Sequence, residues 1–135
     1  MINDVLVNKS QVIKRCLQRI KEEYNGDVQN LQNYTKQDSI ILNLQRACEA
    51  AIDLAMHIVA EKNLGIPQSS RQAFELLCQN NIIEAELAEK LKAMVGFRNI
   101  AVHDYQAVNL NILEKIIESH LDDFKIFTNK LLQIK

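Results

Sequence analysis

The sequence predicts an all-α protein. Only three Gly and one Pro interrupt its 135 residues, and Trp is absent. Apolar residues make up 47% of the chain, and over long stretches they recur at intervals of three and four positions. This composition and spacing are typical of amphipathic helices rather than of turn-rich sheets. A chain of this length can bury one core, so we expect a single helical domain over residues 1–135.

Two long helices are expected in the N-terminal half of the chain. Apolar positions recur along residues 2–24, and the Asn-Gly pair that follows ends this first helix. The polar residues 27–37 can hold either an extra helical turn or a flexible loop. Apolar positions along residues 40–59 then predict a second helix that ends before Pro67, because proline cannot continue a helix.

The C-terminal half predicts one short and two long helices. Ser69 or Ser70 can cap a short helix that ends near Asn80. A fourth helix carries an apolar stripe over residues 87–95, and a fifth carries one over residues 113–132. Long helices joined by short connections pack as antiparallel neighbours. The expected fold is therefore an up-and-down four-helix bundle with one additional short helix.

Charge and cysteine content exclude several classes of protein. The net charge of -1 provides no overall field that would attract a polyanion, so any such site must be local. No apolar stretch approaches the ~18 residues of a membrane span, and no signal peptide is evident, so we expect a cytoplasmic protein. Cys16, Cys48 and Cys78 lie far apart among apolar neighbours, which is typical of reduced core thiols.

Arg98 breaks the apolar stripe of the fourth helix. It follows Leu91 by seven residues and Val95 by three, so a guanidinium lies on the packing face. A buried unpaired charge is costly, and Arg98 therefore needs an acidic partner, a subunit interface or an anionic ligand. Glu49 and Asp53 on the second helix are the candidate acidic partners.

Those two carboxylates belong to a possible polar strip. Arg46, Glu49 and Asp53 are three and four residues apart, which places them on one side of the second helix. We interpret the strip as a structural ion-pair layer, with orientation of Arg98 by Glu49 or Asp53 as the functional alternative. No two His residues have metal-ligand spacing on one helix, so no metal site is expected.

The segment around Arg98 resembles a known family. Arg98, His103 and Tyr105 reproduce the Arg-x-x-x-x-His-x-Tyr motif of the HEPN superfamily. Three segments are similar to its HepT toxins, which are encoded beside a minimal nucleotidyltransferase: LNLQRACEAAIDLAMHI, LGIPQSSRQAF and KAMVGFRNIAVHDY. The resemblance covers residues 38–106. It implies a dimeric, metal-independent endoribonuclease toxin that has an RNA substrate, no cofactor of its own, and an antitoxin partner that uses ATP.

The motif residues suit RNA cleavage. His103 can exchange a proton near neutral pH, and the planar guanidinium of Arg98 matches phosphate oxygens. If the resemblance holds, the product carries a 2′,3′-cyclic phosphate. On an unbroken helix His103 lies about 140° around the axis from Arg98, whereas Tyr105 lies about 20° from it. Either the helix ends or distorts near Val102, or Arg98 of one subunit works beside His103 of another.

The remaining motif positions leave alternatives open. The resemblance implies that Tyr105 accepts AMP groups from the nucleotidyltransferase, which silences the nuclease; otherwise Tyr105 supplies packing and a hydrogen bond at the helix end. Asn99 can orient RNA or bond within a dimer, although a structural role is favoured. Asp104 can hold His103 or attract Arg98, although plain solvent exposure is favoured.

The alternative function is a non-catalytic one. The same bundle could serve a nucleotidyltransferase as a substrate-binding or scaffolding subunit that cleaves nothing. The presence of both Arg98 and His103 favours the enzyme, because a scaffold would not require the pair.

Overall fold

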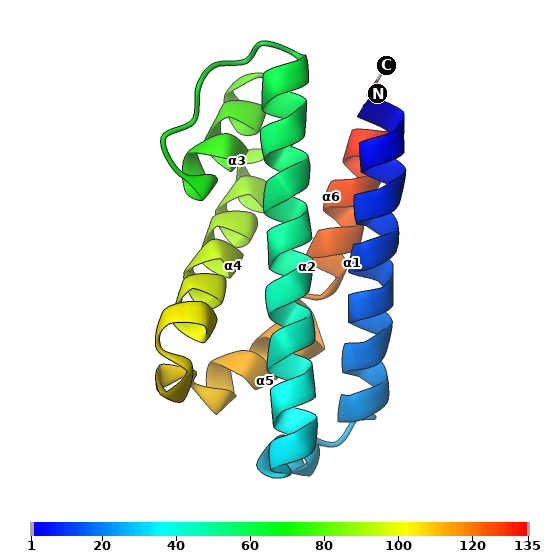
Figure 1. Cartoon of the computed structure of the whole chain (residues 1–135), viewed down its shortest axis with the longest axis vertical. Coiled ribbons are helices and arrows are strands. Elements are labelled where there is room, and N and C mark those ends of the chain that lie inside the picture. Colours follow the sequence, from blue (N-terminus) through cyan, green and yellow to red (C-terminus); the bar gives the residue numbers. More distant parts are fainter. Residues whose placement is uncertain (1, 135) are drawn as a thin grey trace.

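The computed structural model describes residues 2–134, and every regular element in this range is helical. The elements are α1 (Ile2–Tyr24), η1 (Val28–Gln32), α2 (Tyr34–Glu61), α3 (Ser70–Gln79), α4 (Ala85–His103), η2 (Tyr105–Ala107), α5 (Leu110–Ser119) and α6 (Asp122–Leu132), where η denotes a 3-10 helix. Helices α1, α2, α4 and α6 alternate in direction along the bundle (Figure 1). Helix α5 crosses one end of it, and both termini lie at the other (Figure 1). The predicted all-α class is confirmed.

Local signals in the sequence set the ends of the first helices. Helix α1 ends where predicted, because Asn25 and Gly26 adopt the left-handed backbone conformation, with φ of 50° and 70°. The polar stretch that follows contains η1, whose Leu31 is buried, so it holds an extra turn rather than a flexible loop. Helix α3 begins at the predicted cap, since the Ser69 side chain accepts a hydrogen bond of 3.1 Å from the Gln72 amide.

The prediction of one long C-terminal helix is wrong, because the chain breaks it into α5 and α6. Hydrogen bonds between residues three apart, from the amides of Asp123 and Phe124 to the carbonyls of His120 and Leu121, replace the regular pattern at the break. The His120 ring lies 3.1 Å from the buried Asp123 carboxylate. Acidic residues favour the first turn of a helix, which explains why a new helix begins at this point. The bundle therefore carries two short helices, α3 and α5, instead of one.

The helices enclose an apolar core. Its largest fully buried side chains include Phe74, Phe124 and Phe127. Burial raises the pKa of the Cys16 and Cys48 thiols, which keeps both protonated at neutral pH. All three cysteines are free; Cys16 and Cys48 are buried, as predicted for core thiols, whereas Cys78 is only partly buried. No helix within residues 2–134 is both long enough and apolar enough to cross a membrane.

Candidate active site

Helix α4 holds Arg98 against α2, where Glu49 provides its acidic partner. The Arg98 Nε atom donates a hydrogen bond of 3.1 Å to Glu49 Oε2, and Nη2 lies 3.1 Å from the same oxygen. The pair is partly open to solvent, with the Arg98 side chain 29% exposed and that of Glu49 36% exposed. A guanidinium on the packing face is thus compensated by a carboxylate of the neighbouring helix, which confirms one of the alternatives.

The guanidinium keeps capacity for a further anion. Arg98 Nη1 donates a hydrogen bond of 3.1 Å to Asn99 Oδ1, so Asn99 contacts the Arg98 side chain directly. A guanidinium carries five N–H groups, and the contacts to Glu49 and Asn99 engage at most three of them. Because the side chain is also partly exposed, the remaining donors can reach a phosphate oxygen from solvent.

The predicted ion-pair layer of Arg46, Glu49 and Asp53 is wrong. Asp53 Oδ2 lies 3.0 Å from Lys9 Nζ of α1 instead. Arg46 lines a groove between α1 and α2 instead of pairing along its own helix. Asp53 therefore supports α1, and only Glu49 of the two candidate carboxylates holds Arg98.

His103 is the last residue of α4, and its side chain is exposed. The hydrogen bond of 2.8 Å from the Asp104 amide to the Ile100 carbonyl keeps the backbone helical through His103. The helix does not end before His103, so the angle of about 140° between Arg98 and His103 applies. Asp104 is exposed and caps the helix end. Because the two catalytic candidates of one chain face different directions, the geometry favours a site shared between subunits.

Tyr105 begins η2, and its hydroxyl donates a hydrogen bond to the Asp38 carboxylate on α2. The side chain is 41% exposed. Partial burial and the bond to Asp38 raise the pKa of Tyr105 from 10.0 to about 12. At neutral pH the phenol is therefore protonated, open to solvent, and already bonded to a group that can take its proton.

Sequence reasoning missed Asp38. A usable signal exists, because Asp38 precedes Glu49 by eleven residues and lies only about 20° from it around α2. The two carboxylates thus form one acidic edge of α2 that faces the C-terminal part of α4. Glu49 holds Arg98 at this edge and Asp38 holds Tyr105.

Other titratable groups lie outside this arrangement. Within the described part of the chain, no three His, Cys, Asp or Glu side chains gather closely enough to hold a metal ion. His120 pairs with Asp123 at the start of α6. The candidate site is therefore confined to α4, η2 and the acidic edge of α2.

Comparison with known proteins places the chain in a family. The model of the family described as Ribonuclease HepT-like matches residues 13–131. The chain belongs to the HepT-like family. A Shewanella oneidensis relative named mRNA nuclease HepT is 55% identical over 126 residues, which cover 93% of this HepT-like chain and 95% of the relative. An Aphanizomenon flos-aquae relative named tRNA nuclease HepT is 25% identical over 128 residues, covering 94% and 87% of the two chains.

Solved structures share the HepT-like fold along almost the whole chain. The tri-AMPylated Shewanella oneidensis HEPN toxin, solved in complex with MNT antitoxin, has a TM-score of 0.92 and 52% identity, with 97% of this chain and 98% of that chain covered. A chain of a toxin-antitoxin complex solved with AMP-PNP has a TM-score of 0.93 and 51% identity, with coverage of 97% and 99%. The arrangement of helices around Arg98 is thus that of the toxin subunits.

Proposed function

We propose that this HepT-like protein is the toxin of a prokaryotic toxin-antitoxin pair and cleaves RNA as a metal-independent endoribonuclease in the cytoplasm. The observation that carries the proposal is the Arg98 guanidinium, which is fixed by Glu49, partly exposed, and part of one motif with His103 and Tyr105. The nuclease names of the relatives and the antitoxin bound to the related toxin support it.

The cleavage step uses proton transfer and charge stabilisation. His103 takes the proton of the ribose 2′-hydroxyl, and the 2′-oxygen forms a bond to the adjacent phosphorus. The bond from phosphorus to the 5′-oxygen breaks, and that oxygen takes up a proton. Arg98 offsets the charge that builds on the phosphate oxygens in the transition state. The products are a 2′,3′-cyclic phosphate and a 5′-hydroxyl.

The site is completed by a second copy of the chain. Arg98 of one protomer lies beside His103 of the other, because the two side chains of one protomer diverge around α4. Ile100 and Val102 support a contact at this end of α4, since they are 45% and 41% exposed although apolar. The dimer also brings two guanidiniums to one cleft, which gives the local positive potential that the net charge lacks.

The partner is a minimal nucleotidyltransferase antitoxin that modifies Tyr105 with AMP. The phenolic oxygen attacks the α-phosphorus of ATP, pyrophosphate leaves, and Asp38 is placed to take the phenolic proton. The antitoxin binds the ATP, and the toxin holds no cofactor of its own. The attached phosphate adds negative charge near Arg98 and opposes the entry of RNA.

A cleavage assay tests the proposed activity. Protein of verified unmodified mass is incubated with a mixed RNA pool in EDTA, and the termini of the fragments are identified by mass spectrometry. The proposal predicts cleavage that leaves 2′,3′-cyclic phosphates. Intact RNA after incubation with an unmodified dimer would refute it and leave the scaffolding subunit as the remaining function.

Replacing Glu49 by glutamine is expected to slow cleavage by about tenfold, because Arg98 loses the charged partner that fixes its direction. The free energy of unfolding should change by no more than about 1 kcal/mol, since the pair is partly exposed. Single-turnover cleavage and urea unfolding measure the two effects. Asp53→Asn is the matched control and should cleave at the parental rate, because Asp53 pairs with Lys9. Equal loss in both variants would contradict the assignment of Glu49.

A further inference from the structure

A basic groove lies between α1 and α2. It has a volume of about 390 Å³. Three of its lining side chains are cationic, namely Arg15, Arg19 and Arg46, and Glu22 is the only acidic one. The groove thus concentrates positive charge in a protein whose net charge is -1.

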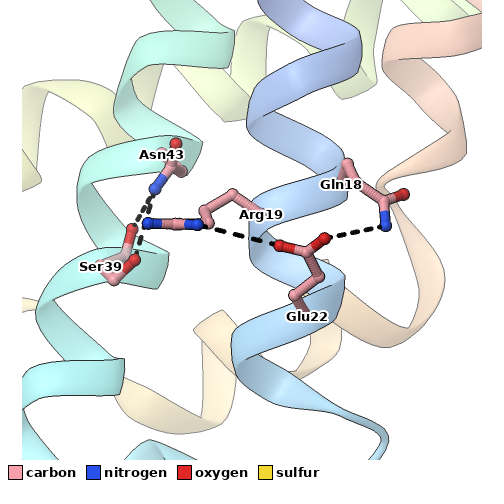
Figure 2. Close-up of polar contacts among 5 residues, drawn as sticks. All are labelled: Gln18, Arg19, Glu22, Ser39 and Asn43. Atoms are coloured by element: carbon pink, nitrogen blue, oxygen red, sulfur yellow. Dashed lines mark hydrogen bonds and ion pairs between the residues drawn. The ribbon is translucent and has the colours of Figure 1, made fainter.

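Helix α1 directs Arg19 across the groove toward α2. Figure 2 shows the Arg19 guanidinium reaching from α1 toward Ser39 and Asn43. Its pairing with Glu22 is loose, at 3.9 Å between Arg19 Nη1 and Glu22 Oε1, and Gln18 Nε2 donates a hydrogen bond of 3.3 Å to the other Glu22 oxygen. The Arg19 side chain is 63% exposed. Most of its donors therefore remain available to a ligand.

In the part of the chain that the structure describes, the positive charges of the other two arginines in the groove are not paired with a nearby carboxylate. Within residues 2–134, neither Arg15 nor Arg46 lies within 4.0 Å of a carboxylate. Both side chains are exposed and line the groove, Arg15 from α1 and Arg46 from α2. Arg15 and Arg46 thus converge on one place from two helices. Planar guanidiniums that converge in this way match the oxygens of phosphate groups.

The groove is continuous with the candidate active site through α2. Arg46 precedes Glu49 by three residues, so about one helical turn separates the groove from the carboxylate that holds Arg98. Arg46 lies about 60° around α2 from Glu49, toward α1. A polyanion with one phosphate at Arg98 can therefore cross the exposed surface of α2 and place other phosphates in the groove.

We propose that this groove binds backbone phosphates of single-stranded RNA on one side of the scissile bond. The inference rests on the proposed ribonuclease function and adds a second substrate contact outside the catalytic cleft. Arg15, Arg19 and Arg46 contact the phosphates. These contacts add affinity without reading sequence.

Binding measurements test the groove in a cleavage-deficient His103→Ala background. Arg15→Gln/Arg46→Gln is compared with Lys14→Gln/Lys125→Gln, which removes the same charge from a different groove, between α1 and α6. Fluorescence anisotropy follows the binding of a labelled single-stranded RNA over a range of KCl concentrations. For the arginine pair we expect about tenfold weaker binding and a log-log salt slope shallower by about 1.4, or about 0.7 for each lost phosphate contact. The Lys14→Gln/Lys125→Gln variant should bind the RNA as tightly as its parent does.

Cleavage kinetics supply the second readout. In the chain with intact His103, Arg15→Gln/Arg46→Gln should raise KM for a long RNA and leave kcat unchanged, whereas cleavage of a dinucleotide should not change. If the Arg15→Gln/Arg46→Gln variant binds RNA as tightly as its parent, or if both double variants lose the same RNA affinity, the proposed RNA contact in the groove is wrong, even though the protein still cleaves RNA. The proposed RNA contact is also wrong if the Arg15→Gln/Arg46→Gln variant keeps its affinity for RNA and loses affinity for the antitoxin. That result would identify an acidic segment of the antitoxin as the occupant of the groove. A parent that neither binds nor cleaves RNA would instead overturn the proposed function itself, and the groove with it.

Discussion

Replacing His103 by alanine is expected to lower the rate of RNA cleavage by about 10²- to 10⁴-fold, because the 2′-hydroxyl loses the base that takes its proton. His103 is exposed at the end of α4 and bears no part of the core, so the fold should remain intact. Single-turnover cleavage of a defined RNA measures the rate, and circular dichroism verifies the helix content. A variant that cleaves at the parental rate would exclude His103 from the chemistry.

Replacing Arg98 by alanine is expected to lower the rate of RNA cleavage by a similar factor, for a different reason. Arg98→Ala removes the cation that faces the charge on the phosphate, and loss of such a stabilising group costs about 10²- to 10³-fold in rate. Arg98→Lys keeps a charge but not the planar fork, and should retain only part of the activity. The two substitutions together separate the need for charge from the need for its geometry.

Mixing the two inactive variants tests whether the site is shared. If Arg98 and His103 act across the dimer, a mixed dimer of Arg98→Ala and His103→Ala chains has one intact site and one that lacks both groups. Random exchange of subunits should then restore about a quarter of the parental activity, since half of the dimers are mixed and each has one of two sites. No recovery after verified exchange would place both groups in a site formed by one chain.

The elements with strong local signals could be predicted from the sequence. The Asn-Gly pair after α1 and the serine cap of α3 mark helix ends by backbone and hydrogen-bonding preferences that act over a few residues. The break between α5 and α6 was missed, because the apolar spacing continues from Leu113 through Phe124 without interruption. Only the acidic pair Asp122 and Asp123 gave a signal for a second helix start.

The candidate site depended on contacts that the sequence does not encode locally. The motif identified Arg98, His103 and Tyr105, but spacing along α2 could not decide between Glu49 and Asp53. That choice depends on how α2 is rotated, which turns Glu49 toward α4 and Asp53 toward Lys9 of α1. The arginine groove was missed for the same reason, since its side chains meet only when α1 and α2 pack in a particular register.

Modification of Tyr105 should silence the nuclease, and Tyr105→Phe should make the enzyme resistant to that silencing. The phenyl ring keeps the packing but offers no oxygen to the α-phosphorus of ATP. Incubation with the antitoxin and ATP should lower cleavage by the parent about 10²-fold or more, because negative charge placed beside an anionic substrate costs several kcal/mol. Tyr105→Phe should keep both its mass and its activity under the same treatment.

Two further variants test whether AMP transfer depends on the surroundings of the Tyr105 hydroxyl. Tyr34→Phe is the matched control: Tyr34 is 79% exposed at the start of α2, and its loss should leave silencing intact. Asp38→Asn should lower the pKa of Tyr105 from about 12 toward its ordinary value of 10.0, because a charged acceptor is removed while burial remains. It should nevertheless slow AMP transfer, since no carboxylate is left to take the phenolic proton. Faster transfer would mean that acidity of the phenol limits the reaction, and continued silencing of Tyr105→Phe would mean that AMP is attached elsewhere.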